Sequence, residues 1–408
     1  MASRCAMAVM IRIGLVLLHQ DSLGTIVRVR ELANSLATTG FEIYIISPFG
    51  IHEMGFHGVH SMRMVRSLGN LIYSPIGSSL RKALLPPRSR AGLSLKPELI
   101  RRGIDFLGKN IAKIADKLQL DILEGEQDIA AAAVVKASDS VGIPAVAGLH
   151  NIWREELLGQ RGLHRQTDEF LRGLLTWTLD SADLTTVVSD AMKAQLISNY
   201  QGRPKQIQVV PLGCRPKRTN VPYPDGGPPN VVHSGQISFY DNEDLLLRTA
   251  IEFKKRSNGP FYMARKGDGA RLFEGRARKL GASLDWYWYP NPDDFYNFLR
   301  KCNLGVVTSL DHPTRHYGPS MKFYDYLSCG LPIVANKIGG WTDEIKQYGV
   351  GYLADSDPIS MVEAIISLAS DREKAYAAAQ RALTLAHSTF NIDSITKQLA
   401  LRYTALVS

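Results

Sequence analysis

Residues 316–335, with the sequence HYGPSMKFYDYLSCGLPIVA, predict a loop, a short helix and a buried strand, in that order. Gly318 and Pro319 interrupt the chain, and Ser320 is a good N-cap because its hydroxyl can accept a hydrogen bond from a backbone N–H of the first turn. Gly330 suits the left-handed position that follows a helix. The apolar residues after it indicate a buried strand.

Two charged residues on this helix suggest a binding role. Lys322 and Asp325 are three residues apart, so their side chains are neighbours on one face. A helix start with a lysine in its first turn suits a phosphate, because free N–H groups, the positive end of the helix dipole and an ammonium group converge there. A carboxylate one turn later can accept hydrogen bonds from two ribose hydroxyls. The alternative is an ordinary surface helix with an i,i+3 ion pair.

Length and composition bound the protein class. The chain has 408 residues, enough for two or three domains, with 45% hydrophobic and 21% charged residues, as in a globular protein. Its four cysteines are scattered, with no CxxC motif and no His/Cys cluster, which argues against structural zinc and disulfides and fits a reducing cytosol. We expect residues 1–18 to be a frayed tail that leads into a first strand, not a signal peptide.

The net charge of +9 belongs to one segment. Residues 60–120 hold twelve Lys/Arg and three Asp/Glu, whereas the rest of the chain holds 36 of each sign. Apolar residues lie beside these basic ones, notably Leu71, Ile72 and Tyr73, which suits an anionic membrane surface. A solvated loop with a chance charge bias is the alternative. No nucleic-acid-binding motif is present, so nucleic acid is not an expected partner.

Strand and helix signals alternate along the chain, stop at a segment rich in proline and glycine, and then restart. This alternation predicts parallel sheets with right-handed crossovers, hence an α/β protein with two doubly wound, Rossmann-like domains. Ligands bind such sheets at the carboxyl ends of the strands, so we expect a site in a cleft between the domains. The expected parts are an N-terminal domain (1–215), a linker (216–229), a C-terminal domain (230–390) and a helix that crosses back to the N-terminal domain (391–408).

Some local expectations can be checked directly. Residues 50–96 show no periodicity and are expected to be irregular. Asp190 is expected to cap a helix that ends near Tyr200. The turn after the first strand is not a GxGxxG motif, so the dinucleotide fingerprint is absent.

The order and spacing of these motifs resemble the GT-B fold glycosyltransferases, most closely glycosyltransferase family 4. The resemblance covers nearly the whole chain. The stretches that carry it are 24–48, 142–150 (GIPAVAGLH), 182–189 (ADLTTVVS), 207–213 (IQVVPLG), 317–335, Gly339 and Gly340 with Glu344, and 349–353.

The family pattern is incomplete at the donor site. The resemblance implies two glutamates eight positions apart, but Tyr317 replaces the first and the shorter Asp325 replaces the second. It also implies an arginine and a lysine after the first strand of the second half, where this chain has Gln236 and Asp241 or Asn242. Lys322 is therefore the expected replacement for the cations that hold the diphosphate.

The resemblance assigns roles to further residues. Lys322 and His150 are expected to be catalytic, with His150 facing the donor sugar. Arg265, Lys266 and Arg315 are further candidates for charge neutralisation. Residues expected to bind substrate through backbone or side chain are Gly24, Gly235, Tyr317, Gly318, Pro319, Ser320, Met321 and Asp325. If the enzyme inverts, a carboxylate base is needed, and Asp21, Glu124, Glu126 and Glu155 remain open.

We therefore expect a metal-independent glycosyltransferase that moves a hexose from a UDP- or GDP-sugar to a lipid-linked or polysaccharide acceptor. We expect no cofactor, and a cytoplasmic location at the inner face of the membrane, bound through residues 60–120. The alternatives are a GT-B sugar-nucleotide epimerase and a non-catalytic nucleotide-sugar-binding subunit. The sequence does not choose the donor, the acceptor, the stereochemical outcome or the oligomeric state.

Overall fold

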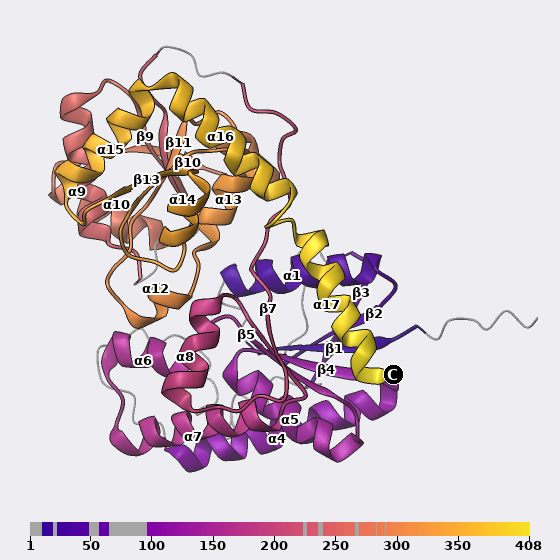
Figure 1. Ribbon diagram of the computed structural model, residues 1–408. Coiled ribbons are helices and arrows are strands. Elements are labelled where there is room, and N and C mark those ends of the chain that lie inside the picture. The colour runs from indigo at the N-terminus through magenta and orange to yellow at the C-terminus, as the bar shows by residue number, and fades with distance from the viewer. Residues whose placement is uncertain are drawn as a thin grey trace, which may run out of the picture. The chain divides into compact units, whose positions relative to one another are not determined.

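The structure, a computed structural model, describes residues 10–18, 23–48, 57–64, 96–222, 227–235, 240–265, 269–282, 284–289 and 291–408. The chain divides into two compact units. Unit 1 comprises Met1–Pro211 and Ile395–Ser408, and unit 2 comprises Leu212–Ser394. The chain thus passes from one unit to the other twice, and its last helix belongs to the unit with which it begins (Figure 1).

Unit 1 is built on a parallel sheet with the strand order β3-β2-β1-β4-β5-β6-β7. Its strands are β1 (Arg12–Leu17), β2 (Glu42–Ser47), β3 (Val59–Arg63), β4 (Ile122–Glu126), β5 (Ala145–Leu149), β6 (Leu184–Val187) and β7 (Ile207–Val209). Every strand pair is parallel, which requires a crossover between neighbours. The strand order reverses between β1 and β4, and such a switch point is where doubly wound sheets bind ligands.

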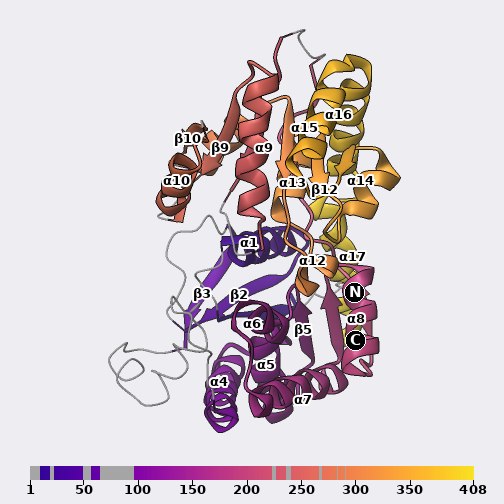
Figure 2. The same cartoon turned by 90° about the vertical axis from the view of Figure 1, so that its left-hand side faces the viewer.

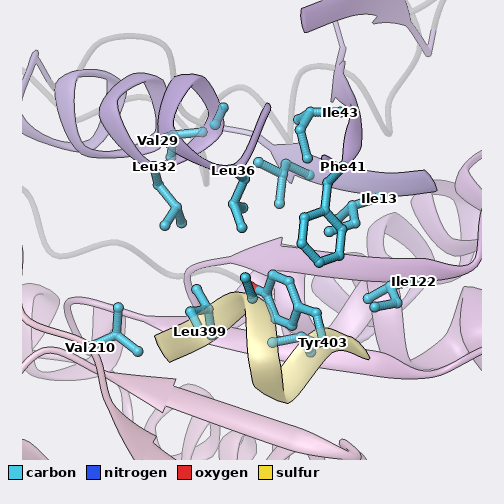
Figure 3. Packing of buried hydrophobic residues seen from close by; sticks show 14 of the residues in the cluster. Ile13, Val29, Leu32, Leu36, Phe41, Ile43, Ile122, Val210, Leu399 and Tyr403 are labelled. Carbon is cyan, nitrogen blue, oxygen red and sulfur yellow. The ribbon is translucent and has the colours of Figure 1, made fainter. Parts of the chain in front are cut away.

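Helices cover both faces of this sheet. They are α1 (Leu23–Thr38), α4 (Pro97–Leu118), α5 (Asp128–Val141), α6 (Trp153–Arg161), α7 (Arg165–Ser181), α8 (Asp190–Tyr200) and α17 (Ile392–Val407). Figure 2 shows α4, α5 and α7 on the opposite side of the sheet from α1. On the α1 side, Leu32 and Leu36 of α1 share one core with Leu399 and Tyr403 of α17 (Figure 3). The C-terminal helix is therefore part of the unit 1 core.

Unit 2 has a second parallel sheet, with the order β10-β9-β8-β11-β12-β13. Its strands are β8 (Val231–Ser234), β9 (Phe261–Arg265), β10 (Asp285–Trp288), β11 (Leu304–Val307), β12 (Ile333–Asn336) and β13 (Gly351–Ala354). Its helices are α9 (Glu243–Arg256), α10 (Gly269–Lys279), α11 (Pro292–Leu299), α12 (Pro313–Tyr317), α13 (Met321–Cys329), α14 (Thr342–Tyr348), α15 (Pro358–Ser370) and α16 (Arg372–His387). The strand order reverses between β8 and β11.

Three local expectations were wrong. Within residues 50–96, expected to be irregular, residues 59–63 form β3, a strand that pairs with β2 on one side only, while residues 50–56 and 65–95 lie outside the described residues. An edge strand needs no continuous apolar run, so the mixed sequence VHSMR gave no signal. Ser189, not Asp190, caps α8, because its hydroxyl accepts from Met192 N–H. Ser320 stands at the N-cap position of α13, but its side chain makes no capping hydrogen bond.

The helix that begins at Met321 is not a surface helix. Lys322 is only 8% exposed, and Phe323, Tyr324, Tyr326 and Leu327 are buried. The alternative of an ordinary exposed ion-paired helix is therefore excluded. Among all the residues that the structure describes, no helix is both long and apolar enough to span a bilayer.

Candidate functional site

The switch point of unit 2 is fixed by one tyrosine of α13. The Tyr326 hydroxyl accepts a hydrogen bond from Ser234 N–H at 3.0 Å and lies 3.2 Å from the carbonyl oxygens of Val232 and Val306. It thus joins α13 to both β8 and β11. Gly305 makes room for the ring, because a Cβ there would lie 2.5 Å from Tyr326. The start of α13 is held in this way over the carboxyl ends of the two strands.

The start of α9 lies at the same edge of the sheet. Leu310 N–H donates to the carbonyl of Tyr240 at 2.8 Å, and Asn242 N–H donates to the carbonyl of Thr308 at 3.4 Å. These bonds tie the residues before α9 to the chain that follows β11. The Asn242 side chain caps α9 by accepting from Leu245 N–H. The positive end of the α9 dipole therefore points toward the switch point.

A buried ion pair joins these two helix starts. Lys322 Nζ lies 3.2 Å from Asp241 Oδ1, and the two side chains are 10% and 2% exposed. Removing two charges from water is costly unless they are paired, so each of these residues depends on the other. Asp241 is one of the two residues, with Asn242, at which the family pattern implied a lysine. The chain thus has one cation and its counter-ion at this point.

A second cation contacts the residue that precedes Asp241. The guanidinium of Arg315 in α12 lies 4.6 Å from the Tyr240 ring centroid and 5.7 Å from that of Trp341. Contacts of this kind attract the cation to the ring face and limit its motion. Tyr240 directly precedes Asp241, so the two cations contact adjacent residues. Arginine in a fixed orientation is well suited to binding a phosphate through two N–H groups.

Asp325 lies one turn after Lys322 and is held by another aromatic residue. The Tyr296 hydroxyl of α11 donates to Asp325 Oδ1 at 2.9 Å. Burial raises the pKa of Asp325 to about 6, although the hydrogen bond from Tyr296 and the charge of Lys322 oppose this rise. The carboxylate is therefore ionised at neutral pH but gains its proton in mild acid.

Unit 1 has buried charges at its own switch point. Glu124 and Glu126 are alternate residues of β4, so they point to the same face, and both are at most 1% exposed. Glu126 Oε2 lies 3.2 Å from Nδ1 of His150, just beyond β5, and 4.0 Å from Nε of Arg28 in α1. Glu124 accepts a hydrogen bond from the hydroxyl of Tyr403 in α17.

The two glutamates have different protonation states. Burial and the nearby charge of Glu126 raise the pKa of Glu124 to about 8, so it keeps its proton at neutral pH. Burial also opposes ionisation of Glu126, but the hydrogen bond from His150 and the charge of Arg28 outweigh it and lower the pKa. Burial lowers the pKa of His150, which is therefore neutral. Neighbouring carboxyls whose pKa values are pushed apart are characteristic of functional sites.

Two family models match the chain in succession. The model described as Glycosyltransferase Family 4 matches residues 24–218, and the model described as Glycosyl transferases group 1 matches residues 217–384. Together they cover most of the sequence without a gap. The chain belongs to the family 4 glycosyltransferases. Glycosyltransferase activity with a nucleotide-sugar donor follows from this membership.

Solved structures agree with the GT-B fold of this glycosyltransferase. Sucrose-phosphate synthase from Thermosynechococcus elongatus has a TM-score of 0.73 at 15% identity, covering 97% of this chain and 99% of that chain. Anabaena Alr3699/HepE in complex with UDP-glucose has a TM-score of 0.64 at 15% identity, covering 97% and 99%. The catalytic domain of Starch Synthase IV from Arabidopsis thaliana, bound to ADP and acarbose, has a TM-score of 0.67 at 12% identity, covering 98% and 99%. No curated protein sequence matches the chain.

The fold class and the family resemblance predicted from the sequence are thus confirmed. The roles predicted for individual residues of the glycosyltransferase stay predictions, and the structure shows where those residues lie. Tyr317 is 3% exposed, Ser320 is 5% exposed, and Gly318, Pro319 and Met321 are half-buried around the start of α13. Gly235 follows β8 with a φ of 77°, a conformation that suits glycine.

Other predicted residues are spread through the glycosyltransferase. Gly24 is the second residue of α1. Glu155 of α6 accepts hydrogen bonds from Gln195 and Tyr200 and has a structural place between helices. The candidates Asp21, Gln236 and Lys266, together with the side chain of Arg265, lie outside the described residues.

Several neighbours of the site were not predicted, among them Arg28, Gln127 and Tyr403. Each reaches the unit 1 site through tertiary packing, which no local sequence motif predicts. Within the described ranges, no group of three or more His, Cys, Asp or Glu side chains is placed to hold a metal ion.

Proposed function

We propose that this glycosyltransferase moves a hexose from a UDP- or GDP-sugar to a lipid-linked or polysaccharide acceptor, without a metal ion, at the inner face of the cytoplasmic membrane. The observation that carries the proposal is that two cations of unit 2 contact adjacent residues just before α9, Lys322 at Asp241 and Arg315 at Tyr240. Departure of a nucleoside diphosphate leaves negative charge on its phosphate oxygens, and fixed cations with helix N-termini stabilise such charge.

The ion pair suggests how the diphosphate binds. In the absence of a donor, Asp241 neutralises Lys322. A phosphate that reaches the start of α13 competes with Asp241 for the ammonium group, and it also gains the backbone N–H groups of the helix start. Arg315, which the aromatic rings of Tyr240 and Trp341 hold in place, supplies a second positive charge.

Asp325 is proposed to hold the ribose. Its carboxylate already accepts one hydrogen bond from a hydroxyl, that of Tyr296 at 2.9 Å. Two neighbouring ribose hydroxyls present the same kind of donor. His150, in unit 1, is proposed to take a hydroxyl of a sugar substrate, as the family resemblance implies.

The membrane proposal rests on composition. Residues 60–120 carry the whole net charge, and their described part includes the exposed basic residues Arg101 and Arg102 of α4. Residues 65–95 of this segment lie outside the described ranges. Basic residues next to apolar ones bind anionic lipid headgroups, and salt weakens that binding. Reversing the charges of Arg81, Lys82, Arg88 and Arg90 should weaken binding to anionic vesicles, and unchanged binding would contradict the proposal.

The decisive experiment measures donor binding and turnover together. Thermal shift against UDP-, GDP- and ADP-sugars identifies the nucleotide, because a bound ligand raises the unfolding temperature. Transfer of a labelled sugar to a lipid-linked acceptor then tests the reaction. Lys322→Ala should abolish binding of the chosen nucleotide, whereas the control Lys346→Ala, at an exposed lysine of α14, should not. Donor isomerisation without acceptor would indicate an epimerase, and binding without turnover a non-catalytic subunit.

A further inference from the structure

Gln127 has a backbone conformation that only glycine adopts freely. It joins β4 to α5 with φ 74° and ψ 164°. Any residue with a side chain is strained in this region, and such strain persists where the surrounding structure enforces it. Here Gln127 N–H donates to the carbonyl of Gly148 at 2.8 Å, and its own carbonyl accepts from Ala131 N–H at 2.8 Å. The β5 strand and the first turn of α5 therefore hold the strained residue from both sides.

The side chain of Gln127 makes a contact that glycine cannot make. Although Gln127 occupies the N-cap position of α5, its side chain does not cap the helix. Its amide Nε2 instead lies 3.1 Å from Nε2 of His150. The NH2 group of the amide can only donate, so the His150 nitrogen in this contact is the acceptor.

The other ring nitrogen of His150 faces a carboxylate. Nδ1 lies 3.2 Å from Glu126 Oε2, and Arg28 Nε lies 4.0 Å from the same oxygen. A neutral imidazole carries one N–H and one lone pair. A carboxylate oxygen 3.2 Å away favours the tautomer with the N–H on Nδ1, which leaves the lone pair on Nε2. Both contacts select the same tautomer.

We propose that Glu126 and Gln127 are positioning residues that fix His150 with Nε2 as a hydrogen-bond acceptor for a hydroxyl group of the sugar substrate. This inference rests on the role proposed for His150 above. A sugar hydroxyl and the Gln127 amide are both donors, so the hydroxyl replaces the amide on Nε2. The lone pair of Nε2 matches a hydroxyl donor and offers no hydrogen to a phosphate oxygen, which makes the subsite selective for a hydroxyl.

Gly148 leaves the space that this arrangement needs. A Cβ at Gly148 would lie 3.0 Å from Glu124 Oε1 and 3.3 Å from Glu126 Oε2. Both carboxyls thus lie against the β5 backbone, with Glu124 turned to Tyr403 and Glu126 turned to His150. Gln127 and Glu126 therefore contact the imidazole of His150, and Gly148 leaves room for the two carboxyls.

The tautomer can be read by NMR of protein with ¹⁵N-labelled histidine. The chain has ten histidines, and the His150 signal is the one that a His150→Asn variant lacks. We expect the wild type to show the neutral form with the proton on Nδ1 at pH 7.5. Glu126→Met, which has no oxygen to accept from Nδ1–H, should weaken this preference. A proton on Nε2 in the wild type would overturn the proposal. This readout needs no turnover, so it decides the arrangement even if the proposed function fails.

A pair of glycine variants tests the role of Gln127. Gln127→Gly relieves the strain, so its unfolding temperature should equal or exceed that of the wild type, while kcat/KM falls about tenfold. The matched control is Gln119→Gly, because Gln119 also has a positive φ (51°) but lies at the exposed end of α4. This control should gain stability and keep its activity. Unchanged kcat/KM in Gln127→Gly would show that the Gln127 side chain does not position His150, and would contradict the proposal.

Discussion

Glu124 should make the docking of the C-terminal helix depend on pH. Burial and the charge of Glu126 raise the pKa of Glu124 from an ordinary 4.5 to about 8, and its partner is the hydroxyl of Tyr403 in α17. The folded state therefore keeps a proton that the unfolded state loses above pH 4.5. The contribution of Glu124 to the free energy of unfolding is therefore complete below pH 4.5, falls as the pH rises, and is lost above about pH 8.

The size of the effect follows from the pKa difference. One pKa unit corresponds to about 1.4 kcal/mol, so the window from 4.5 to 8 spans on the order of 5 kcal/mol. Glu124→Gln removes the titrating group but keeps an oxygen that accepts from Tyr403. The variant should match the wild type near pH 5 and exceed its stability at pH 9.

Hydrogen exchange read by mass spectrometry gives the local measurement. The exchange of the α17 amides reports the free energy of opening of that helix, after correction for the intrinsic rate at each pH. For the wild type this free energy should fall by up to about 1.4 kcal/mol per pH unit between pH 6 and 8, relative to Glu124→Gln. As a control, Tyr403→Phe should lower the free energy but keep the slope. Parallel curves for the wild type and Glu124→Gln would refute the reasoning.

Three further predictions concern unit 2. Arg315→Ala should weaken UDP binding about tenfold in calorimetry, or ~1.4 kcal/mol, because it removes a fixed cation. Arg248→Ala, at an exposed arginine of α9, is the control. Equal UDP affinities of Arg315→Ala and the wild type would contradict the role of Arg315. Uridine binding should weaken as the pH falls through about 6, since Asp325 gains a proton there and accepts ribose hydroxyls poorly. Asp325→Asn should remove that dependence, and a persisting one would assign it elsewhere. Tyr326→Phe should lower the free energy of unfolding by about 2 kcal/mol in urea titration, because buried backbone groups lose their partner; a change below roughly 0.5 kcal/mol would count against the tyrosine as the link between α13 and the sheet.

Much of the fold could be predicted because its signals are local. Residues 316–335 contain a glycine stop and an apolar strand, and the structure places α13, a left-handed Gly330 and β12 there. Both sheets are parallel, as the alternation of strands and helices predicted. The edge strand β3 was missed because it is paired on one side only, so its sequence is not constrained to be apolar.

The sites were harder to predict because their contacts are distant in sequence. Lys322 and Asp241 are 81 residues apart, and Tyr403 and Glu124 are 279 apart. No periodicity or motif records that such residues meet. The family pattern indicated an anomaly at Asp241 or Asn242, but only tertiary packing shows that Asp241 pairs with Lys322. The strain at Gln127 is equally hidden, since nothing in the letters of residues 122–128 predicts a positive φ.

The two switch points offer opposite hydrogen-bonding chemistry. Unit 2 presents donors and positive charge: Lys322, Arg315 and the starts of α9 and α13. Unit 1 presents acceptors: the ionised Glu126 and, by our inference, the lone pair of His150. The unit 2 site therefore suits an anion such as a diphosphate, and the unit 1 site suits a hydroxyl group. A buried charge is costly unless it is paired, which explains why each site keeps an internal partner, Asp241 for Lys322 and Arg28 for Glu126. These partners hold the sites in a defined geometry before substrate arrives, and in unit 2 the substrate must displace its partner, so Asp241 should set how tightly the diphosphate binds.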